Sequence, residues 1–514
     1  MESIFHNANV ITIDMACPRV QAVAVEGGRI KAVGADAEIA ALRDGHTRVV
    51  DCHGGALLPG FIDAHIHLLS YAASLLSIDC SPAAVSSIAD IQAAVRRRAA
   101  RVPAGSWLRA VGYDETALAE RRPPTRWELD AAAPGHPVRL IQRTGHASVL
   151  NSLALAHAGI GIATEEPPGG YMERDLATGE PSGLLIEMNE LLDAVIPAVD
   201  CVEMTRAVRQ ASDNLLAEGV TAIQDATATN GPDAWETFRR LLDDGCLRPA
   251  VTLMEGLESL GKLPEEGASG RLRRGPVKIA IKELGDEIVP NDEDLAEMVW
   301  QAHGGGRQVA IHAVGQRAVA AAVQAIERAL QRLPAGRQGP RPDHRHRIEH
   351  CGLCPPALAE RIGRLGIAVV SQPSFLHFNG DLYLARVDRA DLPHLYPFAR
   401  LLRAAVSVAA GSDAPVVTPR PLLSIQTAVT RAGRRGVAVA PLEAVDVEQA
   451  LRMHTAAAAW AAFQEGERGC LSPGRAADFV LLSNDPTALP ADEIADLEVE
   501  MTVVGGEVAW PAVR

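Results

Sequence analysis

Short apolar runs alternate with helix-periodic stretches through the middle of this chain. In residues 205–225, for example, Val208, Ala211 and Leu215 fall on one helical face, and a strand-like run follows Gly219. Repeated alternation of this kind is typical of βα units. It predicts a parallel sheet with helices on its outer face.

Eight apolar runs have the length of core strands. They are 61–67, 220–225, 249–254, 276–282, 308–312, 346–350, 367–372 and 405–412. Because eight parallel strands can close into a barrel, we expect an α/β fold with a TIM-like (β/α)8 barrel over residues 58–464. The long interval after the first strand predicts a large insertion at 70–205, with its own strands near 107–111 and 138–141, which we expect to cover the active-site rim.

Both ends of the chain show a different pattern, in which short strand-like runs are separated by turns. The runs 10–13, 22–25 and 29–33 lie at the N-terminal end, and the runs 478–482 and 501–504 lie near the other end. Each set is too small to form a stable sheet by itself. We therefore expect residues 1–57 and 465–514 to combine into one small β-sandwich domain.

Composition narrows the range of partners. The chain has 514 residues, of which 47% are hydrophobic and 22% charged, with 49 Lys and Arg against 64 Asp and Glu for a net charge of −15. This balance is typical of a soluble globular protein. The net negative charge and the lack of a tract rich in Lys and Arg argue against nucleic-acid and membrane partners. No N-terminal targeting signal or membrane span is evident, so we expect a cytoplasmic protein. We expect its partner to be a small-molecule substrate, and the chain could also form a homo-oligomer.

The motif His65-Ile66-His67 lies in the first predicted barrel strand. Residues two apart in a strand point to the same side, so both imidazoles face one point. The flanking residues are apolar, which indicates a buried strand where unpartnered polar rings would be costly. The pair is a candidate metal chelate.

Three further polar residues follow predicted strands at the same edge of the barrel. His312, His350 and Asp413 each stand at the C-terminal end of a different strand. In α/β barrels this edge carries the active site. Nitrogen and oxygen donors of this kind suit zinc, iron, manganese or nickel.

Lys278 interrupts an apolar strand. A buried ammonium group is costly unless it is paired, neutralised or chemically changed. Carboxylation by CO₂ would convert it to a carbamate that can bridge two metal ions, whereas the alternative is a lysine that reaches solvent at the barrel end.

Together these motifs resemble the amidohydrolase superfamily, in particular amidohydrolase family 3, the branch with formamide deformylases and YtcJ-like hydrolases. The segments that carry the resemblance are 58–67, 145–151, 179–183, 219–226, 277–278, 312–315, 347–350, 411–415 and 473–479. The resemblance implies a metallo-hydrolase barrel.

From the resemblance, one or two divalent ions, with zinc the first expectation, would be surrounded by six residues: His65, His67, Lys278 as a carbamate, His312, His350 and Asp413. Asp413 would act as the general base. The implied activity is hydrolysis of a non-peptide carbon–nitrogen bond, in an amide, N-acyl or N-formyl substrate, by metal-activated hydroxide.

Outside this ligand set, His146 in the insertion is a candidate catalytic residue, with a histidine satisfied inside a turn as the alternative. Tyr113, Asp114, Gln372 and His377 are candidate substrate contacts. Two other functions stay open: a metal-dependent deaminase of an amino-heterocycle, and a non-catalytic relative that keeps the barrel for assembly.

Overall fold

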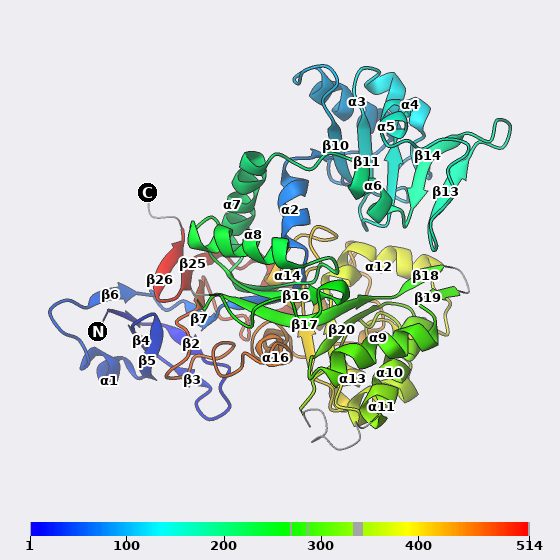
Figure 1. The fold of residues 1–514 in the computed structure, drawn as a ribbon. Helices are drawn as coiled ribbons and strands as arrows, with labels where there is room; N and C mark the ends of the chain where they lie inside the picture. The colour runs from blue at the N-terminus through cyan, green and yellow to red at the C-terminus, as the bar shows by residue number, and fades with distance from the viewer. Residues whose placement is uncertain (1, 268–269, 285–286, 333–342, 512–514) are drawn as a thin grey trace. The chain divides into compact units, whose positions relative to one another are not determined.

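The structure is a computed structural model that describes residues 2–267, 270–284, 287–332 and 343–511 (Figure 1). Contacts between residues divide the chain into two compact units: residues 1–67 with 212–514, and residues 68–211. No helix within the described residues is long and apolar enough to cross a membrane.

The first unit contains a parallel sheet of eight strands, which confirms the predicted barrel. In sheet order its strands are β8 (Phe61–Ile66), β15 (Val220–Asp225), β16 (Ala250–Gly256), β17 (Leu272–Ala280), β20 (Val309–Ala313), β21 (Arg347–His350), β22 (Ala368–Ser371) and β23 (Val408–Ala410). Every one of them overlaps a predicted run. Most of their residues are buried, which explains why the sequence shows continuous apolar runs rather than alternation.

Helices follow most of these strands and cover the sheet (Figure 1). They are α8 (Pro232–Asp243), α9 (Asp292–Gly304), α10 (Gln316–Gln331), α11 (Pro356–Arg364), α12 (Ser374–Arg386), α13 (Phe398–Arg403), α14 (Pro421–Thr430), α15 (Val447–Met453) and α16 (Ala456–Ala461). The buried side chains of α10, such as Val319, Val323 and Ile326, form one apolar stripe. Burial of that stripe, more than helix propensity, holds such helices in place.

Strands from the two ends of the chain form two sheets in the first unit. One sheet has the order β5 (Arg29–Gly34), β4 (Ala22–Glu26), β1 (Ser3–His6), β6 (Arg48–Asp51). The other has the order β26 (Glu507–Trp510), β25 (Val499–Val504), β24 (Phe479–Leu482), β7 (Ala56–Pro59), β2 (Asn9–Ile11), β3 (Arg19–Val20). The rings of Phe5 and Phe479 meet edge to face, with 4.7 Å between centroids, in a core shared by both sheets.

The second unit has a sheet and a core of its own. Its strands lie in the order β13 (Tyr171–Arg174), β14 (Pro181–Ile186), β12 (Ala147–Leu150), β11 (Val138–Gln142), β10 (Leu108–Tyr113), β9 (Ile78–Asp79). Its helices include α3 (Ile88–Ala99), α4 (Arg126–Ala132) and α5 (Ser152–His157). The two strands predicted within the insertion correspond to β10 and β11. That this unit covers the barrel rim stays a prediction.

Three histidines gather beside the beginnings of β20 and β21. The Val309 backbone N–H donates to His346 Nδ1 (3.1 Å), so the proton of His346 lies on Nε2 and points to His303 Nδ1 (2.8 Å). The backbone N–H of His346 donates to His344 Nδ1 (2.9 Å). Burial lowers the pKa of all three imidazoles, and the pKa of the fully buried His346 falls well below its usual value. The cluster is therefore built from neutral rings.

This arrangement makes stability depend on pH. Below about pH 6.5 the unfolded chain binds a proton at residue 346 that the folded state does not bind, so the free energy of unfolding falls as pH drops. In His346→Gln the fall between pH 6.5 and 5.5 should be shallower by up to about 1 kcal/mol. Urea unfolding at pH 7.5, 6.5 and 5.5 measures this, with the exposed His46→Gln as control. Parallel pH profiles for the wild type and His346→Gln would refute the assignment.

Candidate metal centre

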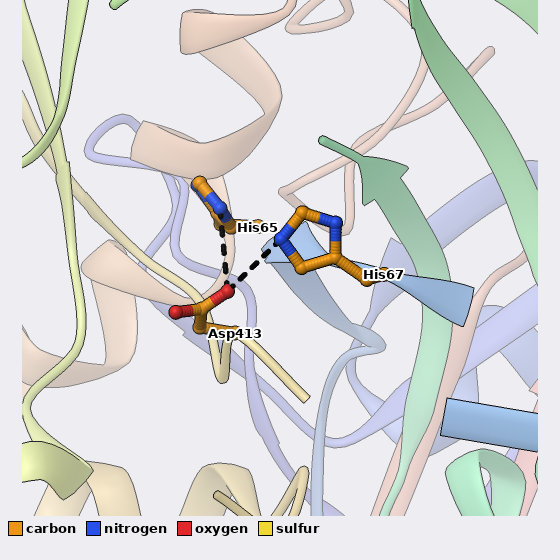
Figure 2. Close-up of side chains that lie close together, drawn as sticks. All are labelled: His65, His67 and Asp413. Carbon is orange, nitrogen blue, oxygen red and sulfur yellow. Dashed lines mark ion pairs between the residues drawn. The ribbon is translucent and has the colours of Figure 1, made fainter. Parts of the chain in front are cut away.

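His65 near the end of the first barrel strand and His67 just after it meet an aspartate that follows the last strand. Asp413 Oδ1 lies 3.2 Å from His67 Nε2 and 3.5 Å from His65 Nε2 (Figure 2). The potential ligand atoms of the three residues all lie within 4.8 Å of one another. Residues 65 and 67 face the same point because β8 alternates its side chains, as the sequence predicts.

A carboxylate fixes the tautomer of His65. The fully buried Glu349 accepts a hydrogen bond from His65 Nδ1–H through Oε2, at 2.5 Å. The lone pair of His65 is thereby placed on Nε2, which is buried and has no hydrogen-bond partner within the described residues. Burial and the nearby charge of Lys278 lower the pKa of His65 to about 3, so the ring is neutral at pH 7. A neutral ring with an open nitrogen is the form that binds a metal ion.

Arg347 keeps that carboxylate ionised. Its guanidinium, fully buried, donates to Glu349 Oε1 (2.5 Å) and Oε2 (3.1 Å), and also to Gln224 Oε1 (2.5 Å) and the Ala64 carbonyl (2.8 Å). Burial alone would raise the pKa of Glu349, but Arg347 and His65 hold it well below its usual value. The negative charge is thus paired rather than isolated, as a buried charge requires.

A second pair of imidazoles lies beside the first. His350 Nδ1–H donates to Gln372 Oε1 (2.7 Å), which leaves the lone pair of His350 on Nε2, 2.9 Å from His312 Nδ1. The ring centroids of His65 and His350 are 4.9 Å apart. The two ring nitrogens of His350 and His312 are close enough either to share a proton or to bind a common ion.

Lys278 and Asp413 complete the cluster. Lys278 is 4% exposed on β17, and burial lowers its pKa. Burial lowers the pKa of both His65 and His350, and the charge of Lys278 acts in the same direction. Burial by itself would raise the pKa of Asp413, but a hydrogen bond from His67 opposes this effect and the pKa lies below its usual value, so Asp413 remains a carboxylate.

The candidates for substrate contact lie in different surroundings. Gln372 is fully buried beside His350, and its Nε2 has no hydrogen-bond partner within the described part of the chain. His377 is half-buried on α12. In the second unit, Asp114 is paired with Arg143 at 2.8 Å.

Tyr113, the other candidate substrate contact, lies in the core of the second unit. Its side chain is fully buried in the hydrophobic core of the second unit. The aromatic ring packs in that core, and the sequence pattern does not distinguish a core position from a position in a pocket wall.

His146 is paired and about half exposed. Its Nδ1 lies 2.6 Å from Glu187 Oε1, and 52% of its side-chain surface is accessible. A carboxylate partner of this kind orients an imidazole. The pair lies entirely within the second unit.

Sequence reasoning missed the residues behind the ligands, namely Gln224, Arg347 and Glu349. One signal was available: in the strand Arg347-Ile348-Glu349-His350, two charged side chains alternate with an apolar one, although the strand lies between buried neighbours. A charged pair on the inner face of a barrel strand requires partners inside the barrel.

Comparison with known proteins gives consistent matches along the whole chain. A family model described as an amidohydrolase family matches residues 48–509. N-substituted formamide deformylase from Arthrobacter pascens is 32% identical, covering 98% of this chain and 97% of that protein. YtcJ of Bacillus subtilis strain 168, named as an amidohydrolase, is 28% identical over 99% of each chain.

A solved structure supports the fold. The crystal structure of an uncharacterized metal-dependent hydrolase from Pyrococcus horikoshii matches with a TM-score of 0.75 and 23% identity, covering 95% of this chain and 99% of that one.

Replacing Glu349 by Gln should weaken metal binding. An amide oxygen accepts the His65 Nδ1–H bond more weakly than a carboxylate does, and it leaves buried Arg347 without its charged partner. Loss of a partner that orients a metal ligand typically costs 10–100-fold in metal affinity. Competition for Zn²⁺ with a chromophoric chelator measures the affinity. Glu443→Gln is the matched control, because Glu443 is also buried and paired with an arginine, Arg400 at 2.7 Å. Equal zinc affinities for both variants would contradict the assigned role.

Proposed function

The chain belongs to the amidohydrolase family, and we propose that it is a metal-dependent hydrolase of a non-peptide carbon–nitrogen bond in a small molecule. The bond would be that of an amide, N-acyl or N-formyl group. The observation that carries the proposal is the convergence of His65, His67 and Asp413 on one point, with the open Nε2 of His65 buried there. The likeness to a formamide deformylase over nearly the whole chain supports the choice of bond.

The donor set fits zinc. Three residues, His65, His67 and Asp413, would hold one ion with two nitrogens and a carboxylate, which is a common zinc ligand set. His312 and His350, with Lys278 as a carbamate, would hold a second. Buried Lys278 fits this role, because carboxylation replaces a costly buried ammonium by an anionic ligand.

The residues of the site suggest how the reaction would proceed. A bound divalent ion supplies Lewis acidity and lowers the pKa of water towards about 7. Asp413, held as a carboxylate, would accept the proton of the attacking water and return it to the departing nitrogen. Glu349 would keep His65 in one tautomer throughout, so that no ligand has to reorganise during turnover.

We also propose that His146 takes part in catalysis from the second unit. Glu187 would orient the ring, and its half-exposed surface would be accessible to a substrate or leaving group. Gln372 and His377, at the end of β22 and on α12, are proposed substrate contacts.

Asp413→Asn and His65→Ala should each abolish turnover, because the first removes the proposed base and the second a proposed ligand. Hydrolysis of a panel of N-formyl and N-acyl compounds by the zinc-loaded protein measures this. Asp485→Asn, which changes an acid paired with Arg19 in the terminal strands, should leave the rate unchanged. A chelator should remove activity and Zn²⁺ should restore it. Full activity in either site variant, or in metal-free protein, would refute the proposal.

His146→Ala should lower kcat/KM by about tenfold or more, the loss expected for one hydrogen bond to the reacting group. Steady-state kinetics on the best compound of the panel gives the value. His157→Ala, an exposed histidine of the same unit, serves as control. If both variants matched the wild type, the interpretation of His146 as a residue of a structural turn would stand instead.

A further inference from the structure

Asp63 lies on β8, two residues before His65, and has no part in the proposed ligand set. It is 3% exposed. Its Oδ1 accepts two backbone hydrogen bonds, one from the Ser412 N–H (2.9 Å) and one from the His65 N–H (3.2 Å). A single carboxylate oxygen therefore joins the first barrel strand to the segment that follows the last one.

The same region contains direct backbone contacts between these segments. The Asp413 N–H donates to the His65 carbonyl (2.7 Å), and the His67 N–H donates to the Ala414 carbonyl (2.9 Å). The Ala414 N–H also donates to Ser412 Oγ (3.0 Å). We call the contacts between residues 63–67 and 411–414 the seam. The barrel thus closes at the level of three proposed metal ligands.

Gly411 allows the two segments to approach so closely. A Cβ at this position would lie 2.5 Å from the His65 backbone nitrogen and 3.0 Å from Asp63 Oδ1. Contacts this short do not occur, so any larger residue would push the seam apart. The seam therefore requires both a glycine on one segment and an acceptor on the other.

The backbone of Asp413 needs such support. Its φ is +59°, in the left-handed region that residues other than glycine adopt uncommonly, aspartate more often than most. This conformation accompanies the contact of its carboxylate with His65 and His67. Because the Asp413 N–H and its neighbour Ser412 N–H are both bonded to the β8 segment, the seam holds the strained residue in place.

We propose that Asp63 is a positioning residue that fastens the seam and so fixes Asp413 relative to His65 and His67. The inference rests on the proposed function, because it takes these three residues as zinc ligands. Asp63 acts through backbone amides: its Oδ1 accepts two N–H groups, and the residues whose ligand atoms converge on one point are His65, His67 and Asp413. An asparagine can retain that acceptor oxygen, whereas an alanine leaves both N–H groups buried without their partner.

The test compares zinc affinity among variants of the full chain, by competition with a chromophoric chelator. Asp63→Ala should bind Zn²⁺ about 10–100-fold more weakly, the usual cost of losing a group that orients ligands. Asp63→Asn should restore the affinity to within a few-fold of the wild type. Gly411→Ala leaves Asp63 intact but separates the two segments, so it should weaken zinc binding as well. It is the variant to measure if Asp63→Ala does not fold.

Asp478→Ala is the matched control. Asp478 is also buried, and its Oδ1 accepts the Gly505 N–H in the terminal strands, at 2.8 Å. This variant should lower the thermal unfolding temperature and leave zinc affinity unchanged.

The outcomes separate the two proposals. If the wild type binds no zinc, the proposed function fails and the inference with it. If the wild type binds zinc and Asp63→Ala binds it equally well, the inference alone is wrong. It is also wrong if Asp478→Ala loses as much affinity, because the effect would then be general destabilisation. If Asp63→Asn loses as much as Asp63→Ala, the charge of Asp63 matters rather than its acceptor, which overturns the positioning role.

Discussion

The buried hydrogen bond from His65 to Glu349 is the interaction on which the candidate metal centre depends. It places the open lone pair of His65 on the nitrogen that faces Asp413. The carboxylate can remain charged inside the barrel only because Arg347 pairs with it, and Arg347 is itself held by Gln224 and a backbone carbonyl. A charged network of this kind tolerates burial when every member is paired. The result is a rigid, preorganised candidate ligand on the first strand.

The barrel explains how residues far apart in sequence reach that ligand. Parallel strands deliver their C-terminal ends to one edge, so His312, His350 and Asp413 arrive beside His65 although they lie on separate strands. Closure of the barrel beside Asp413 then sets the spacing across the first and last strands. The contacts that close the sheet therefore also bring the proposed ligands together.

The sequence predicted the framework well and the supporting contacts poorly. Apolar runs identified all eight barrel strands, because strands buried on both faces appear as continuous hydrophobic stretches. The motif at His65 and His67 was evident from strand alternation together with its apolar flanks. Glu349 was missed because its role depends on a partner 284 positions away, which no local pattern encodes. Tyr113 lies in the core of the second unit, and the sequence did not indicate this because an aromatic residue in a strand has the same local pattern whether it packs in a core or lines a pocket.

The central claim, that these side chains converge to bind a divalent ion, is tested most directly by anomalous X-ray diffraction from crystals of the zinc-loaded protein. The account predicts an anomalous peak at the zinc absorption edge about 2.0–2.2 Å from His65 Nε2, His67 Nε2 and a carboxylate oxygen of Asp413. A fully loaded crystal with no peak there, or with its only peak elsewhere, would contradict it.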